Sequence, residues 1–203
     1  MGRDETDQYK TRITLLQKVQ NQQDDQSWSE FVSSYQDYIY AILRRMNVPV
    51  EDASDLLQQV LVKLWKKLPE IDIHKVKRFR SYLAVTTKNC AHDYVRKRIS
   101  EREKHEKLRH SNELEYFNAI STPDINRIAE VEWSNYVSGL ALKNISEDFS
   151  ENAMILLRGM LAGRDIKELA EELDMGLSTA YRLKSRAKER LLAEIKSLTD
   201  YLG

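Results

Sequence analysis

Residues 165–192 read DIKELAEELDMGLSTAYRLKSRAKERLL, and this stretch decides the fold of the C-terminal part of the chain. Apolar residues recur at helical spacing on both sides of Asp174-Met175-Gly176, which predicts two helices joined by a tight turn. We expect Gly176 to supply a positive backbone dihedral in that turn. The small Ala170 allows the two helices to approach closely. The pattern is typical of a helix-turn-helix, whose second helix inserts into the major groove of DNA.

The second of these helices has one apolar face and one basic face. We expect Ala180, Leu183 and Ala187 to face the core. Early residues of a recognition helix meet base edges, and later cations meet phosphates. The candidate DNA contacts on the outer face are Thr179, Tyr181, Arg182, Ser185 and Arg186. The alternative is a solvated amphipathic helix, but a nearly uniform basic face after a glycine turn favours DNA binding.

Positive charge is concentrated in two parts of a neutral chain. Among 203 residues, 32 Lys and Arg balance 32 Asp and Glu. Residues 75–109 nevertheless contain twelve basic and four acidic residues, a surplus of eight. Residues 181–190 contain five basic residues and one acidic residue, Glu189. Two basic stretches separated by a less basic scaffold indicate two DNA contacts.

Composition disfavours several classes of protein. Cys90 is the only cysteine, so no intramolecular disulfide can form. The four histidines lack the paired spacing of a zinc site, and no apolar run approaches the roughly 18 residues of a membrane span. The sequence shows no phosphate loop, no nucleophile elbow and no paired carboxylates beside a plausible cleft. We therefore expect no catalytic residue, no metal and no cofactor.

Helical periodicity without strand alternation predicts an all-α fold. The expected helices cover residues 27–46, 53–68, 81–98, 125–142, 150–162, 166–173 and 177–201. Ser81 is a plausible N-cap of the third. The pattern weakens over residues 99–124, which are charged, then polar, and are expected to form a linker. The chain should therefore consist of two small helical domains, residues 1–98 and 125–203, the second a helix-turn-helix.

Four motifs in residues 51–98 resemble a known family. They read Asp55-Leu56-Leu57-Gln58-Gln59-Val60-Leu61, Phe79-Arg80-Ser81-Tyr82-Leu83, Thr87-Lys88-Asn89 and Asp93-Tyr94-Val95-Arg96-Lys97. Together they resemble region 2 of the sigma-70 family, and most closely the small extracytoplasmic-function (ECF) group. The C-terminal motif resembles region 4 of the same family. A region 2-like stretch followed by a region 4-like stretch is far more specific to this family than either stretch alone.

The resemblance implies a cytoplasmic, non-catalytic sigma factor that directs bacterial RNA polymerase to promoters and assists promoter melting. Residues 1–98 would bind the polymerase core and the −10 element, and residues 125–203 the −35 element. The implied core-polymerase contacts are Asp55, Gln58, Gln59 and Lys63. The implied −10 contacts are Lys77, Arg78, Arg80, Lys88, Asn89 and Arg96. Many members of the group are held inactive by an anti-sigma protein, so such a partner is also implied.

Other interpretations remain open for single residues and for the whole chain. Phe79 suits either the −10 contact or the core, and Gln59 stands where the family usually has an acidic residue. The apolar residues of the second helix are expected to be core: Leu56, Leu57, Val60, Leu64 and Trp65. The alternative function is a helix-turn-helix repressor or activator acting as a dimer on duplex DNA. That alternative gives no reason for the basic residues between Lys75 and Arg98.

Overall fold

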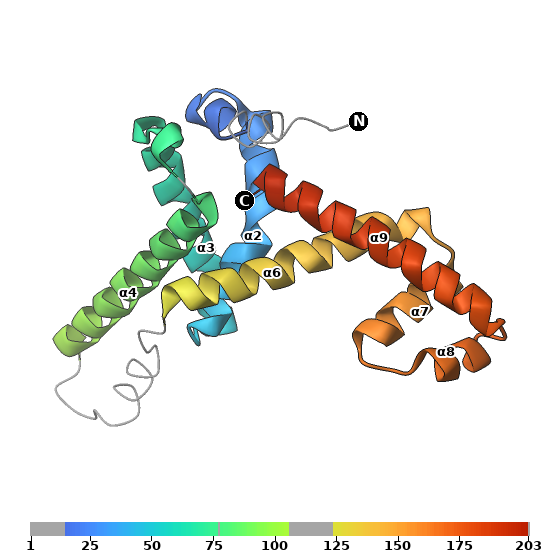
Figure 1. The fold of residues 1–203 in the computed structure, drawn as a ribbon. Helices are drawn as coiled ribbons and strands as arrows, with labels where there is room; N and C mark the ends of the chain where they lie inside the picture. The colour runs from blue at the N-terminus through green and yellow to red at the C-terminus, as the bar shows by residue number, and fades with distance from the viewer. Residues whose placement is uncertain (1–14, 77, 106–123, 203) are drawn as a thin grey trace. The chain divides into compact units, whose positions relative to one another are not determined.

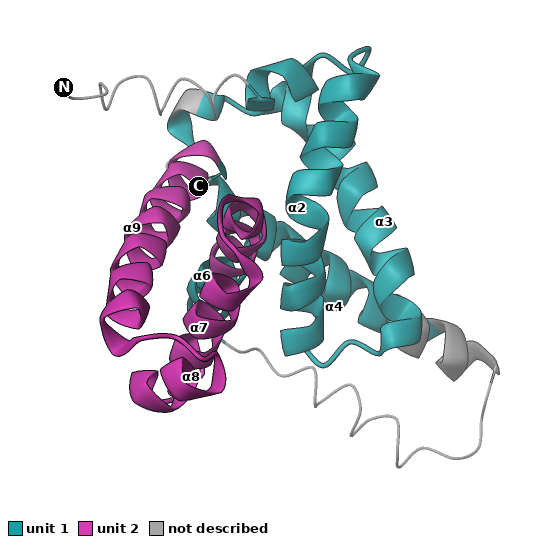
Figure 2. Ribbon diagram, turned by 90° about the vertical axis from the view of Figure 1, so that its right-hand side faces the viewer, with its two compact units in different colours: residues 1–136, 202–203 teal, residues 137–201 magenta. Residues whose placement is uncertain are grey.

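The computed structural model describes residues 15–76, 78–105 and 124–202 (Figure 1). Within these residues all regular structure is α-helix or short 3-10 helix, which confirms the all-α fold class. None of the described helices is both long and apolar enough to span a membrane. The chain divides into two compact units, Met1–Tyr136 with Leu202–Gly203 and Val137–Tyr201 (Figure 2).

The first unit is built on three helices and the beginning of a fourth. These are α2 (Asp25–Arg45), α3 (Val50–Lys67), α4 (Phe79–His105) and the first part of α6 (Ile125–Asn144). Two 3-10 turns, η1 (Leu68–Glu70) and η2 (Ile73–Lys75), connect α3 to α4. Residues 15–20 are also helical. The helix α4 continues to His105, so it includes the first residues of the expected linker, and residues 106–123 lie outside the described residues.

An aromatic cluster determines where α4 begins. Phe79 is 1% exposed, and its ring centroid lies 5.5 Å from that of Tyr35 and 5.8 Å from that of Phe31. Tyr82, one turn later, stacks on Phe79 with ring centroids 5.8 Å apart. Because Phe79 is buried in this cluster, α4 begins at Phe79. Ser81 therefore lies inside the helix, and the prediction of Ser81 as its N-cap is wrong. Of the two interpretations of Phe79, the structure supports the core.

The first part of α6 packs within the first unit. Trp133 is 4% exposed, and its ring meets that of Tyr38 edge-on at 5.2 Å. Tyr136 lies 5.9 Å from Trp133, and its hydroxyl donates a hydrogen bond to the carbonyl of Ser34. The compact units accordingly divide inside α6, between Tyr136 and Val137, whereas the domain bounds expected from the sequence separate at residues 99–124.

The second unit consists of the end of α6 and three further helices. These are α7 (Glu151–Leu161), α8 (Ile166–Glu172) and α9 (Leu177–Leu202), preceded by η3 (Ile145–Asp148). Ser150 and Asp165 cap the N-termini of α7 and α8 by accepting backbone hydrogen bonds. Two apolar clusters hold the unit together. One contains Ala141, Met154, Leu157, Ala187 and Leu191, and the other Leu156, Ile166, Leu169, Ala170 and Ala180.

The turn between α8 and α9 differs from the predicted one. Asp174, not Gly176, has the positive φ, at 47°. The amide of Met175 donates to the carbonyl of Ala170 at 2.9 Å, and that of Asp174 to Glu171 at 3.1 Å. These two bonds form the Schellman motif that ends many helices, and the motif places its left-handed residue directly after the C-cap. Gly176 instead precedes α9 and accepts a hydrogen bond from Ala180.

A glycine in α7 allows α8 to pack closely. A Cβ atom added to Gly159 would lie 2.6 Å from Cδ2 of Leu169, a separation that requires a shift. The sequence predicted close approach at Ala170, which is indeed buried against Ala180. A tighter contact joins α7 to α8, between Gly159 and Leu169.

Candidate nucleic-acid interface

One face of α4 presents polar and basic side chains to solvent. The core side is formed by Leu83, Ala84, Thr87 and Ala91, all of which are buried. The opposite side forms what we call the α4 stripe: Val85, Lys88, Asn89, His92 and Arg96. Their spacing of three or four residues places them on one face of a helix.

Within the α4 stripe, the side chains predicted to meet DNA are accessible. Asn89 is exposed and Lys88 is half-buried, and no described residue pairs with either side chain. Arg96 is 78% exposed in its side chain and lies 3.8 Å from the carboxylate of Asp93. An exposed pair at that distance contributes little stability, so Arg96 can exchange it for a phosphate.

His92 belongs to the α4 stripe, although sequence analysis considered the histidines only as zinc ligands. It lies one helical turn from both Lys88 and Arg96. Burial lowers the pKa of His92 below its usual range, and the charges of Lys88 and Arg96 lower this pKa further. Its Nε2 atom is buried and has no hydrogen-bond partner among the described residues. At neutral pH the ring is therefore uncharged.

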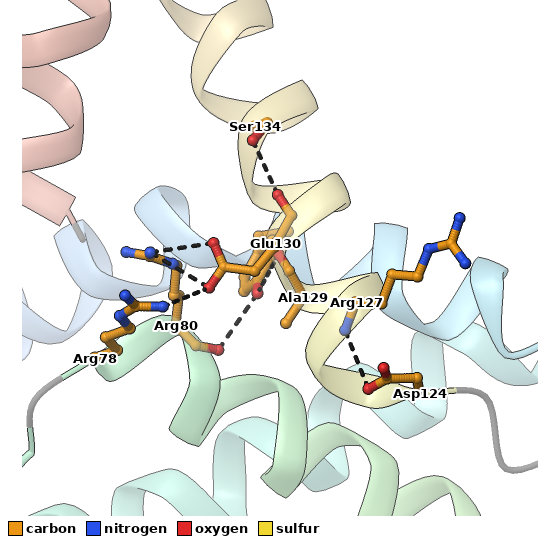
Figure 3. A network of polar contacts seen from close by, with 8 residues as sticks. Arg78, Arg80, Asp124, Arg127, Ala129, Glu130 and Ser134 are labelled. Atoms are coloured by element: carbon orange, nitrogen blue, oxygen red, sulfur yellow. Dashed lines mark hydrogen bonds and ion pairs between the residues drawn. The ribbon is translucent and has the colours of Figure 1, made fainter.

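Arg78, just before α4, and Arg80, in its first turn, pair with Glu130 of α6 (Figure 3), although 63% of the Arg78 side chain remains exposed. The Nη1 atom of Arg78 lies 3.2 Å from Oε1 of Glu130, and the Nη2 atom of Arg80 lies 3.2 Å from Oε2. The guanidinium carbon of Arg80 is 5.7 Å from the ring centroid of Trp133. Only 14% of the Arg80 side chain is exposed. We call Arg78, Arg80, Glu130 and Trp133 the arginine clamp.

The arginine clamp and the α4 stripe are different surfaces. At about 100° per residue, Arg80 shares the side of α4 that carries Ala84, Thr87 and Ala91, whereas Asn89 lies about 180° away. Sequence analysis grouped Arg78 and Arg80 with Lys88, Asn89 and Arg96, and the structure does not bring all five together. Lys77, the remaining candidate of this set, lies outside the described residues.

The connection before α4 is held by two glutamines. The Nε2 atom of Gln20 donates to the carbonyls of Leu68 and Ile71, both at 2.8 Å. Gln22 donates to the carbonyl of Trp65 at 3.0 Å. Because these carbonyls end α3 and η1, the two amides fix the path of the chain towards Arg78. Neither residue could be predicted from the sequence, because an isolated glutamine carries no pattern.

The helix α3 has the amphipathic character that polymerase binding would require. Leu56, Leu57, Val60 and Leu64 are buried, which confirms their prediction as core, and Trp65 packs edge-on against Trp28 at 4.8 Å. The implied polymerase contacts are all exposed, and we call them the α3 surface: Asp55, Gln58, Gln59 and Lys63. Among them Lys63 lies 3.7 Å from Asp93 of α4.

The outer face of α9 is as predicted in its pattern of exposure. Ala180 and Ala187 are buried, and Leu183 is half-buried against the same cluster as Ala180. The candidates Tyr181, Arg182, Ser185 and Arg186 are exposed, whereas Thr179 is half-buried. Two cations lie over aromatic rings. Lys184 is 5.8 Å from the ring centroid of Tyr181, and Arg186 is 5.6 Å from that of Phe149.

Two observations concern metal and thiol chemistry in the described part of the chain. It contains no group of three or more His, Cys, Asp or Glu side chains placed to hold a metal ion. Burial raises the pKa of the Cys90 thiol, which disfavours the reactive thiolate. The exposed faces of α4 and α9 described above carry cations, amides and hydroxyls, which suit binding to phosphates and bases.

Comparison with known proteins finds a similarity within the first unit. Residues 31–100 match the family model of sigma-70 region 2, a span from α2 through most of α4 that includes the α3 surface and the α4 stripe. No curated protein matches the chain. Region 2 implies interaction with core RNA polymerase and promoter DNA, in a family of non-enzymatic transcription initiation factors. Residues 31–100 are therefore similar to sigma-70 region 2, and this match supports a relationship to the sigma-70 family sigma factors.

Proposed function

We propose that this protein is a sigma factor of the ECF group, which directs bacterial RNA polymerase to specific promoters and assists opening of the −10 element. The observation that carries the proposal is the α4 stripe. It places two cations and an amide on an accessible helix face inside the segment that matches sigma-70 region 2. The ECF group also implies an anti-sigma protein as a further partner.

The α4 stripe has the chemistry that strand capture needs. Opening a duplex requires a base that is unstacked and bound, and a basic surface that holds the displaced strand. Lys88 and Arg96 bind phosphates, and the Asn89 amide hydrogen-bonds the edge of an unstacked base. The other two residues of the α4 stripe, Val85 and His92, are uncharged at neutral pH and provide apolar contact for a base.

The second unit reads the −35 element with α9 as the recognition helix. Tyr181, Arg182 and Ser185 are exposed near the start of α9 and contact base edges, with Thr179 beside them. Arg186, one turn after Arg182, contacts a phosphate. Each lost base contact is expected to cost about 1–3 kcal/mol in discrimination.

The exposed polar face of α3 binds the polymerase core. Asp55, Gln58 and Gln59 offer hydrogen-bond acceptors and donors on this face, and Lys63, 3.7 Å from Asp93, adds a cation. Because the buried face of α3 is occupied by the core of the first unit, the polymerase contact uses the exposed face alone.

The decisive experiment is co-elution of the full-length protein with bacterial core RNA polymerase, followed by selection of bound duplexes from a random-sequence DNA library. A monomer that co-elutes with the core and selects DNA only in its presence is the expected result. The variant Asp55→Lys with Gln59→Lys should lose co-elution, while Glu147→Lys with Glu171→Gln, the same increase in charge at exposed positions of the second unit, should retain it. A dimer that selects a two-fold symmetric duplex without polymerase would overturn the proposal in favour of an ordinary repressor or activator.

A further inference from the structure

The first part of α6 carries an acidic and aromatic sequence that contacts the first unit along its length. Residues 129–136 read AEVEWSNY. Glu130 joins the arginine clamp, and Trp133 and Tyr136 pack against Tyr38 at 5.2 and 6.3 Å between ring centroids. We call residues 129–136 the α6 segment. It lies outside residues 31–100, so the match to sigma-70 region 2 does not account for it.

A second ion pair fastens the α6 segment. The Nε atom of Arg45, at the end of α2, lies 2.5 Å from Oε1 of Glu132. Glu132 is 3% exposed, and a carboxylate buried to that degree needs a cation beside it. Arg45 is 56% exposed in its side chain, so it retains access to solvent while it holds Glu132.

Hydrogen bonds between helices complete the attachment. The hydroxyl of Tyr38 lies 3.2 Å from the carbonyl of Ala129 and 3.3 Å from that of Arg80. This buried phenol therefore meets both the α6 segment and the first turn of α4. Burial, the largest cause, raises the pKa of Tyr38, so it stays protonated and able to donate.

From these contacts we infer that the α6 segment is a built-in competitor of promoter DNA, which occupies Arg78 and Arg80 until single-stranded DNA displaces it. The inference rests on the proposed function. A carboxylate that receives two guanidinium groups takes the place that a phosphate takes in nucleic-acid recognition. The Trp133 ring beside Arg80 takes the place of a base stacked on a guanidinium plane.

The contact shows two features of an arrangement that can open. The Nε atom of Arg80 is buried without a hydrogen-bond partner among the described residues, and so is Nε1 of Trp133. Unpaired buried donors weaken a contact, because water would satisfy them once the contact opens. Glu130 itself is about half exposed, so water can enter from that side.

The α4 stripe gives DNA a place to start. Lys88, Asn89 and Arg96 do not contact the α6 segment, so a strand can bind there first and then compete for Arg78 and Arg80. Such a competitor lowers the affinity of the free protein for single-stranded DNA without abolishing it. The binding-competent fraction of the protein sets the size of that reduction.

The test measures binding of a fluorescein-labelled, random-sequence single-stranded DNA of 20 nucleotides to the full-length protein at one fixed low salt concentration. Glu130→Gln should raise the affinity about three- to tenfold, because it removes the charge that holds both arginines. Glu147→Gln is the matched control, since it removes the same charge from an exposed site in the second unit. Only a larger gain for Glu130→Gln than for the control supports the inference.

Hydrogen exchange of the same proteins gives a second readout that depends on the attachment itself. The peptide spanning residues 125–136 should exchange faster in Glu130→Gln than in the wild type, and the wild-type peptide should exchange faster when DNA is added. Equal affinity of Glu130→Gln and the wild type, including the case in which neither binds, overturns the inference. The proposed function fails separately, if the protein does not co-elute with polymerase core whatever residue stands at position 130.

Discussion

The α4 stripe and the arginine clamp both carry cations close together in the sequence, yet only the cations of the clamp share a carboxylate of α6. Lys88 and Asn89 have no side-chain partner among the described residues, whereas Arg80 is 14% exposed and shares Glu130 with Arg78. The difference comes from a residue about 50 positions later in the chain. A count of positive charges along the sequence therefore overestimates the cations that DNA can reach.

The largest effect is expected from reversing charge in the α4 stripe. Lys88→Glu with Arg96→Glu should reduce single-stranded DNA affinity about 10- to 100-fold, because two phosphate contacts are lost and two repulsions are added. A plot of log affinity against log salt concentration should become shallower by about 1.4 for the two lost contacts. Core-polymerase binding should remain, since the α3 surface is unchanged.

The control for that variant is Lys143→Glu with Lys196→Glu, which makes the same charge change at exposed positions of the second unit. An equal loss of DNA affinity in both variants would mean that net charge, not the α4 stripe, governs binding. Equal loss of polymerase binding and DNA binding in the α4 variant would instead indicate misfolding.

A smaller effect is expected at Arg78, and its size should depend on Glu130. In the wild type, Arg78→Ala removes a DNA contact but also weakens the hold of the α6 segment, so the two consequences oppose each other. In the Glu130→Gln protein only the first consequence remains. Arg78→Ala should therefore reduce DNA affinity less than twofold in the wild type and about three- to fivefold in the Glu130→Gln protein.

The measurement is a double-mutant cycle on the four proteins, with the affinity for the same oligonucleotide as the readout. Additive effects would show that Arg78 and Glu130 do not interact in the protein that binds DNA. That result would mean that Glu130 does not limit the access of DNA to the arginine clamp, and the clamp would no longer differ from the α4 stripe in this respect.

A change of a few-fold is expected from protonating His92. Its folded-state pKa is lowered, so the unfolded chain binds more protons, and His92 reduces stability as the pH falls from its usual pKa towards the folded value. Bound phosphates favour the charged ring, so DNA affinity should instead rise as the pH falls from 7.5 to 5.5. His92→Gln should remove both pH dependences while leaving binding at pH 7.5 nearly unchanged.

Thermal unfolding and fluorescence anisotropy at the two pH values check this prediction. Persistence of the rise in affinity in His92→Gln would assign it to another titrating group. His92 would then be only a neutral filler between Lys88 and Arg96.

Local pattern predicted much of the fold. The helix expected at residues 150–162 is α7, because its cap Ser150 and the spacing of Met154 and Leu157 are both local signals. The core residues of α3 followed in the same way, because Leu56, Leu57, Val60 and Leu64 recur at helical spacing. Both predictions rest on residues within a few turns of one another, which is the range over which sequence patterns act.

Contacts between distant residues could not be predicted. Tyr38 meets Trp133, and Arg78 meets Glu130, across separations that leave no periodic signal. The close approach at Gly159 depends on where Leu169 points, and the sequence does not give that direction. In the candidate site, the sequence proposed the residues, and tertiary packing decided which of them face solvent.

The smallest expected effect is a change of stability that leaves both cation surfaces intact. Asp174 has a φ of 47° at the position where Schellman motifs usually have glycine, so Asp174→Gly relieves strain at the turn before α9. The free energy of unfolding should rise by about 0.5 kcal/mol, because part of the gain is offset by the greater freedom of glycine in the unfolded chain. Gly163, with a φ of 83° in the same motif at the end of α7, offers the opposite test.

Gly163→Ala should lower the free energy of unfolding by about 1 kcal/mol, since alanine is strained at positive φ. Urea unfolding measures both variants, and the affinity for single-stranded DNA should stay within twofold of the wild type in both. An Asp174→Gly protein with a higher free energy of unfolding and unchanged affinity for single-stranded DNA would show that stability does not determine binding. The differences between the α4 stripe and the arginine clamp could then be assigned to their partners and not to a general loosening of the protein.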